Sequence, residues 1–130
     1  QESELDYKKC YIMANPIKSD SSHSSRKEPY VMIARYERDR NEELSIYSGF
    51  EYKLNSEVLT LVDDTNYSLV TEGDMAWAKT RVEDAIIIQK LLQSALLKVR
   101  SNSSVTTYGV DIYSLKGLAK AYARMRTICP

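Results

Sequence analysis

The sequence predicts a mainly β fold: a small antiparallel β-sandwich or a strongly curved antiparallel sheet, with one inserted helix and one C-terminal helix. Several short segments rich in β-branched and aromatic residues are separated by polar turns, which favours antiparallel strands over alternating βαβ units. The chain also contains 10 tyrosines but only 1 phenylalanine. Tyrosine suits half-buried strands and interfaces, where its ring packs and its hydroxyl reaches water or a partner.

Six segments read as strands, and turns lie between them. "YVMIARY" is followed by the charged turn "ERDRNE" and by "ELSIYS", a pattern that predicts a hairpin. "SEVLTLV" and "YSLVTEG" flank "DDTN", whose Asp and Asn residues tolerate left-handed backbone. "LLKVRS" alternates, so Leu97 and Val99 should face inward while Lys98 and Arg100 face water. In "VTTYGVDIYS", Gly109 predicts a bulge or a close approach of another chain segment.

Two segments have helical patterns. "TRVEDAIIIQKLLQS" opens on Thr80 with Glu83 three residues later, which is typical of a capping box. The second helix is predicted from Ser114 onward. Its apolar residues recur at intervals of three or four and form one buried stripe of ordinary core packing: Leu115, Leu118, Tyr122, Met125 and Cys129.

Length and composition predict one domain over residues 1–130, since 130 residues can bury a single core. The chain is 43% apolar and has 18 basic and 18 acidic residues, so no global field favours nucleic acid or an anionic membrane. No stretch approaches the roughly 18 consecutive apolar residues of a membrane-spanning helix. We therefore expect neither a nucleic-acid partner nor a transmembrane segment.

Two polar segments are expected to lie at the surface. "QESELDYKK" lacks the hydrophobic core of a signal peptide, and we interpret it as the exposed start of a mature or trimmed chain. The serine-rich "KSDSSHSSRKEP" predicts a mobile surface loop. It contains the only histidine, His23, which we expect to be a solvated loop residue and not a metal ligand.

The only two cysteines, Cys10 and Cys129, lie near opposite ends of the chain. They could be two unrelated buried thiols, because free cysteine behaves as a small hydrophobe. A metal or redox pair is disfavoured because there is no CxxC and no cluster of His and Cys. A disulfide between the first strand and the last helix is the interpretation that we prefer. Such a bond would persist only in an oxidising compartment.

No set of residues predicts catalysis. A serine or cysteine nucleophile needs a positioned base, and the only histidine lies in the serine-rich segment. The stretch "EGDMAWAKT" carries the most specific pattern. Gly73 and Asp74 fit a tight turn at a strand end, and Trp77 is expected to be a large buried anchor between sheet and helix. We prefer a structural role for Gly73, Asp74 and Trp77, with a binding site as the alternative.

Taken in order, several segments resemble the invasion-associated locus B family of alphaproteobacterial envelope proteins. The resemblance covers nearly the full chain. It is carried by "CYIMANPIKS", "YVMIARY", "GFEYKLNSEVLTLVD", "YSLVTEGDMAWA" and "DIYSLKGLAKAYARM" with Cys129 after it. The chain departs from the family pattern at Ala34, Arg35 and Tyr36, where relatives have Thr-His-Arg-Pro, and at Asn55, where they have glycine.

The resemblance implies a mainly β fold with two helices, export through a signal peptide, and residence in the periplasm or at the outer membrane. It also implies a link to host-cell entry but supplies no biochemical mechanism. We therefore expect a non-enzymatic envelope protein without cofactors or metal, which supports host-cell association by binding a protein or envelope component. The alternative is a periplasmic structural or stress-related module without host contact. The sequence leaves the oligomeric state open.

Overall fold

The computed structural model describes residues 9–37 and 40–130. The expectations for the start of the chain and for the middle of the charged turn "ERDRNE" lie outside these residues. Within the described part, nine strands form one fully antiparallel sheet, in the spatial order β1-β3-β4-β7-β6-β5-β8-β9-β2. The strands are β1 (Lys9–Ala14), β2 (Lys18–Ser21), β3 (Tyr30–Tyr36), β4 (Asn41–Tyr47), β5 (Glu57–Val62), β6 (Thr65–Glu72), β7 (Met75–Trp77), β8 (Leu96–Asn102) and β9 (Tyr108–Ser114).

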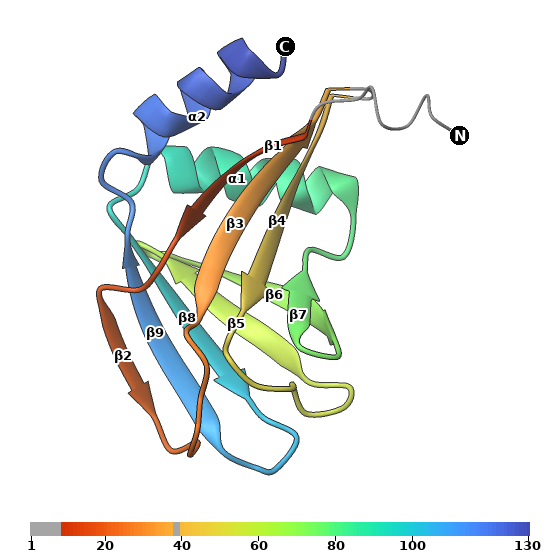
Figure 1. Ribbon diagram of the computed structural model, residues 1–130, viewed down its shortest axis with the longest axis vertical. Coiled ribbons are helices and arrows are strands. Elements are labelled where there is room, and N and C mark those ends of the chain that lie inside the picture. Colours follow the sequence, from red (N-terminus) through yellow and green to blue (C-terminus); the bar gives the residue numbers. More distant parts are fainter. Residues whose placement is uncertain (1–8, 38–39) are drawn as a thin grey trace.

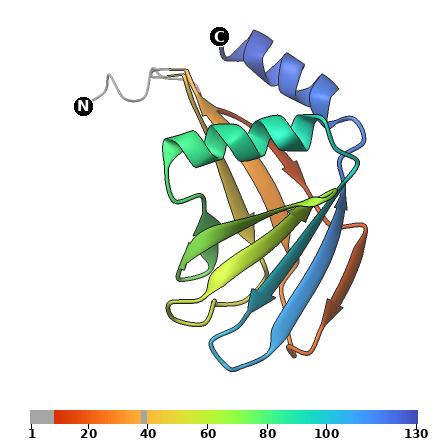
Figure 2. The ribbon, with the colours of Figure 1, turned by 180° about the vertical axis from the view of Figure 1, so that it is seen from behind.

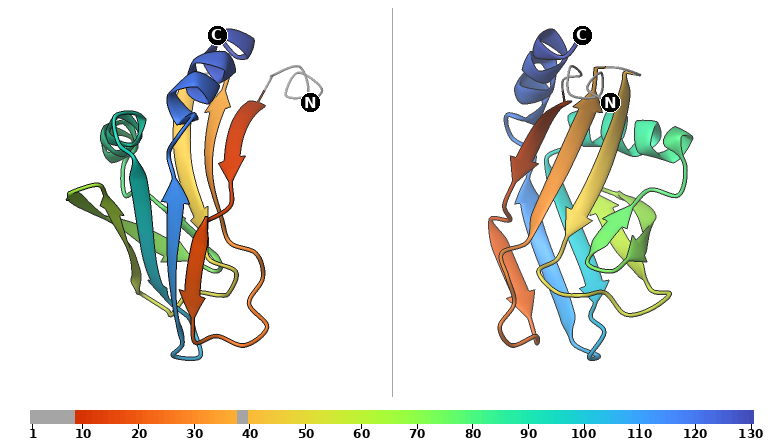
Figure 3. Two further views of the ribbon diagram at one scale, coloured as in Figure 1. Left: turned by 90° about the vertical axis from the view of Figure 1, so that its left-hand side faces the viewer. Right: turned by 45° about the vertical axis from the view of Figure 1, so that its right-hand side comes forward.

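The sheet is strongly curled, because its two edge strands are neighbours in sequence. β1 forms one edge and β2 the other, yet only residues 15–17 separate them. The chain pairs with β3 along β1 as far as Ala14, and from Ile17 onward it bonds to β9, with which β2 pairs. Figures 1 and 3 show the two strands following each other along one side of the curled sheet. The curved-sheet alternative of the predicted fold is therefore the one adopted.

The predicted strands and turns are confirmed. β3 pairs with β4 and β5 with β6 as hairpins, and Asp63 adopts a left-handed backbone in the second turn. Along β8, Leu97 and Val99 are buried while Lys98 and Arg100 are exposed. The prediction that the whole serine-rich segment is a loop is wrong, because its first residues form the edge strand β2.

Two helices cover one end of the curled sheet. Figure 2 shows α1 (Arg81–Leu92) crossing the strand ends and α2 (Leu118–Ile128) lying beside it. The Thr80 hydroxyl accepts a hydrogen bond from the Glu83 backbone amide at 3.1 Å, as the capping pattern predicts. The predicted start of α2 at Ser114 is wrong. Ser114 ends β9, and Gly117, with a φ of 86°, keeps the backbone out of helical geometry until Leu118.

The core fills the inside of the curl. Its apolar side chains come from the sheet and from both helices, and they include Leu44, Ile46 and Val99 from strands and Ile87 and Leu91 from α1. The predicted stripe on α2 is confirmed, since Tyr122, Met125 and Cys129 are buried, and Leu115 and Leu118 pack against the core. Along β9 the inward positions Gly109, Asp111 and Tyr113 are all buried. This strand therefore carries polar groups into the interior.

Candidate functional site

Cys10 and Cys129 form a disulfide, as preferred from the sequence. It joins the edge strand β1 to the C-terminal end of α2 over a separation of 119 residues, with 6.1 Å between the two Cα atoms. Cys129 is fully buried, while Cys10 is half-buried beside a groove that Tyr11, Arg124 and Ile128 help to line. The bond therefore holds α2 to β1, an edge strand whose only neighbour in the sheet is β3.

Arg35 on β3 provides a second attachment for the same end of α2. Its side chain is almost fully buried, and its Nε donates to the Cys129 carbonyl oxygen at 2.5 Å. A second nitrogen donates to the Pro130 carbonyl at 3.0 Å, and a third to the Glu42 carboxylate at 2.7 Å. The last carbonyls of a helix have no partner within the helix. Arg35 therefore gives hydrogen-bond donors to two carbonyl groups at the end of α2, of which that of Cys129 is buried.

Glu42 on β4 links this attachment to the middle of α2. Its carboxylate accepts a hydrogen bond from the Tyr122 hydroxyl at 2.5 Å as well as from Arg35. Burial, followed by the hydrogen bond to Glu42, raises the pKa of the Tyr122 hydroxyl above its ordinary value. The disulfide, Arg35 and Glu42 together fasten α2 to three strands.

The predicted motif residues do not form one site. Gly73 and Asp74 are exposed in the turn between β6 and β7, where they help to line an open hollow of about 530 Å³. Trp77 lies elsewhere. On β7 it is Ala76 that points into the core, opposite Ile46, while Trp77 is half-buried on the other face. The expectation that Trp77 is a buried anchor between sheet and helix is therefore wrong.

The rest of this hollow is lined by the serine-rich segment, by the end of β4 with the loop after it, and by Ser104 between β8 and β9. His23 contacts the Thr107 hydroxyl at 2.7 Å, and its ring lies 5.0 Å from that of Phe50. It is half-buried, so the expectation of a solvated histidine is also wrong. The residues lining the hollow are His23, Ser25, Lys27, Tyr47, Gly49, Phe50, Glu51, Gly73, Asp74 and Ser104.

Arg26 fixes the serine-rich segment against the sheet. Its guanidinium forms an ion pair with Asp111, which is fully buried on β9, and its Nε donates to the Ser48 carbonyl at 2.7 Å. The Ser19 hydroxyl donates to the other Asp111 oxygen at 2.7 Å. A surface loop held by a buried ion pair is anchored, which corrects the prediction of a mobile loop.

Two glycines make room for this segment. Gly49 has a φ of 84°, and a Cβ there would lie 2.1 Å from the Lys27 carbonyl oxygen. A Cβ at Gly109 would lie 2.8 Å from the Arg26 guanidinium. Gly109 is thus the point of close approach that its place in a strand predicts.

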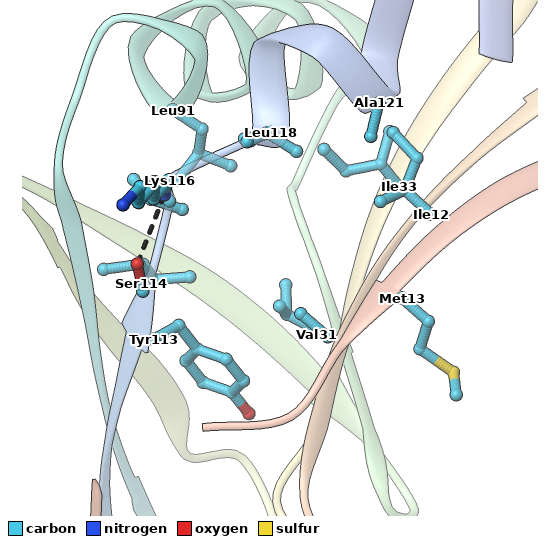
Figure 4. A pocket seen from close by; sticks show the side chains of 14 residues that line it. Ile12, Met13, Val31, Ile33, Leu91, Tyr113, Ser114, Lys116, Leu118 and Ala121 are labelled. Carbon is cyan, nitrogen blue, oxygen red and sulfur yellow. Dashed lines mark hydrogen bonds between the residues drawn. The ribbon is translucent and has the colours of Figure 1, made fainter. Parts of the chain in front are cut away.

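A second concavity is mainly apolar and lies beneath α2, with a volume of about 220 Å³. It occupies the region where β1 has turned away from β9, and both helices close it (Figure 4). Aliphatic side chains from β1, β3, β8, both helices and the connection between β9 and α2 form most of its wall: Ile12, Ala14, Val31, Ile33, Leu91, Leu97, Leu115, Leu118 and Ala121. Its polar lining is limited to Tyr113, Ser114 and Lys116, with Met13 and Gly117 completing the set.

Tyr113, one of the lining residues, carries a buried hydroxyl. The residue is 1% exposed, and its hydroxyl has no hydrogen-bond partner among the described residues. Burial, with a smaller contribution from the Asp111 carboxylate, raises the pKa of this hydroxyl far above its ordinary value. The group therefore stays neutral and available as a donor.

The described residues contain no group of three or more His, Cys, Asp or Glu side chains placed to hold a metal ion. None of the helices in this part of the chain is long and apolar enough to cross a membrane. No protein-family model matches the chain, and neither does any curated protein or solved structure.

Sequence reasoning missed Arg26, Arg35, Asp111 and Tyr113. The alternation of "YGVDIYS" carried a usable signal, because it places Asp111 and Tyr113 on the same face as Gly109. No local pattern could have paired Asp111 with Arg26, since 85 residues separate them.

Proposed function

We propose that this protein is an exported, non-enzymatic component of a bacterial cell envelope that binds another macromolecule. The proposal follows the resemblance to the invasion-associated locus B family. The observation that carries it is the Cys10–Cys129 disulfide, which closes almost the whole described chain. A disulfide of this kind persists in the periplasm or outside the cell and is reduced in most cytosols.

A surface for binding lies next to the disulfide. Tyr11 and Met13 on the outer face of β1 are 60% and 52% exposed, and Ile128 on α2 is 48% exposed. Tyr11 from β1 and Ile128 from α2 line one groove together with Cys10. Exposed aromatic and apolar side chains gathered at a groove are typical of contact sites for other proteins. The disulfide and Arg35 hold both sides of this groove in fixed positions.

Location is tested on intact bacteria that carry the native gene. A membrane-impermeant amine reagent modifies the protein if the protein lies on the cell surface. Fractionation then separates periplasm, outer membrane and cytoplasm. Envelope fractionation with surface modification supports host association. Envelope fractionation without surface modification supports the alternative, a periplasmic module without host contact. Recovery in the cytoplasm contradicts both.

Binding is tested by capture from host membranes and from the bacterium's own envelope. Tyr11→Ser combined with Ile128→Ser should abolish capture without unfolding the protein. Leu54→Ser combined with Val105→Ser is the matched control, because these side chains are 86% and 62% exposed and line none of the three concavities described above. Equal capture by both double variants would contradict the assignment of this groove.

A further inference from the structure

The sheet splits where β7 ends. β7 lies between β4 and β6 but contains only Met75–Trp77, so it pairs with β6 from Glu72 back to Val70 and no further. Beyond Val70, residues 65–69 of β6 have β5 on one side and no strand of the described chain on the other. Figure 3 (left) shows the tip of the yellow-green hairpin of β5 and β6 standing away from β4. We call residues 65–69 the open edge of β6.

Hydrogen-bond register decides which backbone groups the open edge presents. Val62 and Thr65 face each other across the short turn of the β5–β6 hairpin, so they form a hydrogen-bonded pair. Because such pairs alternate along a hairpin, Tyr67 also bonds to β5, while Asn66 and Ser68 turn their N–H and C=O groups away from it. Among the described residues, neither Asn66 nor Ser68 has a partner on this outward side.

The helix α1 satisfies the β4 side of the split but not the β6 side. The Leu44 amide on β4 lies just beyond the end of the pairing with β7, and it donates to the Asp84 carboxylate on α1 at 3.0 Å. No group in the described part of the chain does the same for Asn66 or Ser68. Backbone groups that are shielded from both water and protein partners are rare in folded proteins. The open edge therefore faces water or a further strand.

The strands at the two ends of the sheet are protected against pairing, and the open edge is not. α2 packs against β1 and is joined to it by the disulfide. β2 is short and carries the exposed charges of Lys18 and Asp20. Covering helices, short strands and charged side chains are common means of preventing edge-to-edge pairing. Residues 65–69 read Thr-Asn-Tyr-Ser-Leu, with no charged residue and no proline.

A second copy of this chain fits the open edge because the edge is self-complementary. The hairpin turn at one end and β7 at the other limit an added strand to the length of residues 65–69. The same residues of a second copy have this length and the same outward groups. In antiparallel alignment about a two-fold axis at Tyr67, Asn66 of each copy faces Ser68 of the other. Each of these pairs then exchanges both of its backbone hydrogen bonds.

The side chains suit the same alignment. Tyr67 meets Tyr67 of the second copy at a non-hydrogen-bonded position, where the Cα atoms lie about 4.5 Å apart and aromatic pairs are favourable. Tyr67 is half-buried and packs against the core, so its ring is already held on the inner face of the sheet. At each end, the exposed Asp64 of one copy lies toward the segment after β7 of the other, which carries the exposed Lys79. These charges are complementary.

We propose that two copies of this protein pair through the open edge of β6, in antiparallel alignment about Tyr67, and so continue the sheet across a two-fold axis. The open edge of each copy is used by the other, so this contact closes as a dimer and does not extend into a fibre. A contact along residues 65–69 is small beside the roughly 1,200–2,000 Å² of stable interfaces, so the dimer is weak and forms at high protein concentration. The inference does not depend on where the protein resides or on the groove proposed above for macromolecules.

Sedimentation equilibrium of the purified full chain, from about 10 µM to about 1 mM, measures the association. The mean mass should rise toward twice that of one chain. Amide hydrogen exchange at both concentrations then locates the contact. Exchange at Asn66 and Ser68 should slow about fivefold at the higher concentration, because these amides become paired. The Ser19 amide, which turns away from β9 at the edge of β2, should keep a constant rate.

Two charge variants test the alignment without changing the backbone. Asn66→Lys combined with Ser68→Lys places like charges opposite each other in both cross-copy pairs, so association should weaken about tenfold. Asn66→Glu combined with Ser68→Lys is the matched control, because the same pairs then carry opposite charges and association should be at least as strong as in the wild type. The proposal is overturned if the wild type stays monomeric at about 1 mM, or if exchange at Asn66 and Ser68 does not slow. Equal association of the two double variants would equally overturn it.

Discussion

Single buried polar residues fix the segments of this protein that have little apolar sequence. Arg26 is the clearest case, because its ion pair with Asp111 holds a serine-rich segment that has few apolar side chains of its own. Both side chains are largely buried, so the attraction between the two charges must offset the hydration that each loses on folding.

Asp111→Asn should destabilise the protein by about 3 kcal/mol, because it leaves the Arg26 guanidinium buried beside a neutral amide. Urea unfolding at neutral pH measures the change. The double variant Arg26→Met with Asp111→Asn should recover part of the loss, since no buried charge remains. A single variant as stable as the wild type would show that the pair does not hold this segment.

Gly49→Ala should be strongly destabilising, by more than about 3 kcal/mol, because the new Cβ meets the Lys27 carbonyl in addition to the strain of a positive φ. Gly73→Ala is the matched control. Its φ is 63°, but nothing lies within 4 Å of the added Cβ, so only about 1 kcal/mol should be lost. Thermal unfolding of the two variants compares them. Equal losses would mean that close approach at Gly49 is unimportant.

For single residues, the sequence predicts local backbone roles better than it predicts which distant residue a side chain contacts. The cap at Thr80 and the close approach at Gly109 follow from short patterns, and both are confirmed. Trp77 was misjudged because a large aromatic residue is more often buried than not, whereas here the alternation along β7 places Ala76 inward. The contact of Arg35 with the end of α2 joins positions 94 residues apart, and no local pattern encodes it.

At the scale of elements, the attachment of α1 to the sheet includes a buried carboxylate. Asp84 accepts a hydrogen bond from the Leu44 backbone amide on β4 at 3.0 Å. Burial nevertheless raises the pKa of the Asp84 carboxyl group, with Glu43 and Glu83 as further causes. The folded protein therefore holds a proton on Asp84 more tightly than the unfolded chain does.

This raised pKa predicts how stability responds to pH. Between the unfolded pKa of about 3.9 and the higher folded value, the folded state binds more protons, so the contribution of Asp84 to stability falls as pH rises. Asp84→Asn removes this dependence. Urea unfolding from pH 3.5 to 6 should show the variant gaining stability relative to the wild type as pH increases. A difference that is constant over this range would contradict the raised pKa.

For the C-terminal helix, the sequence predicted the buried face more accurately than the residue at which the helix begins. The stripe from Leu115 to Cys129 follows from spacing alone, and it is confirmed. The start of α2 was placed too early because Leu115 continues the apolar spacing, while Gly117 interrupts the helical backbone. Element boundaries depend on such single backbone conformations, which apolar periodicity does not register.

At the scale of the whole molecule, the disulfide joins the two ends of a curled sheet and helix arrangement. Most of the strand segments and the turns between them are readable from the sequence, but β2 and β7 are not. The pairing of β1 with β3 and of β2 with β9 is not, because it is set by long-range packing. The cavity beneath α2 follows from that pairing, so it too could be found only in the structure.

Replacing Cys10 and Cys129 by serine should lower the melting temperature by at least about 10 °C. Closing a loop of roughly 100 residues is worth up to about 4.7 kcal/mol in the chain-entropy account. The strand signal in circular dichroism should persist below the transition, and α2 should become the first element that protease cleaves. An unchanged melting temperature under oxidising conditions would mean that the bond contributes nothing.

The proposed residence in an oxidising envelope and the Cys10–Cys129 disulfide can be tested together. The most direct measurement is to trap thiols with a maleimide in living cells of the native bacterium, denature the protein, and count modified cysteines by mass. We predict that neither Cys10 nor Cys129 is modified unless reductant is added first, and that the protein is recovered with the envelope. Modification of both cysteines without reductant, in protein recovered from the cytoplasm, would contradict the account.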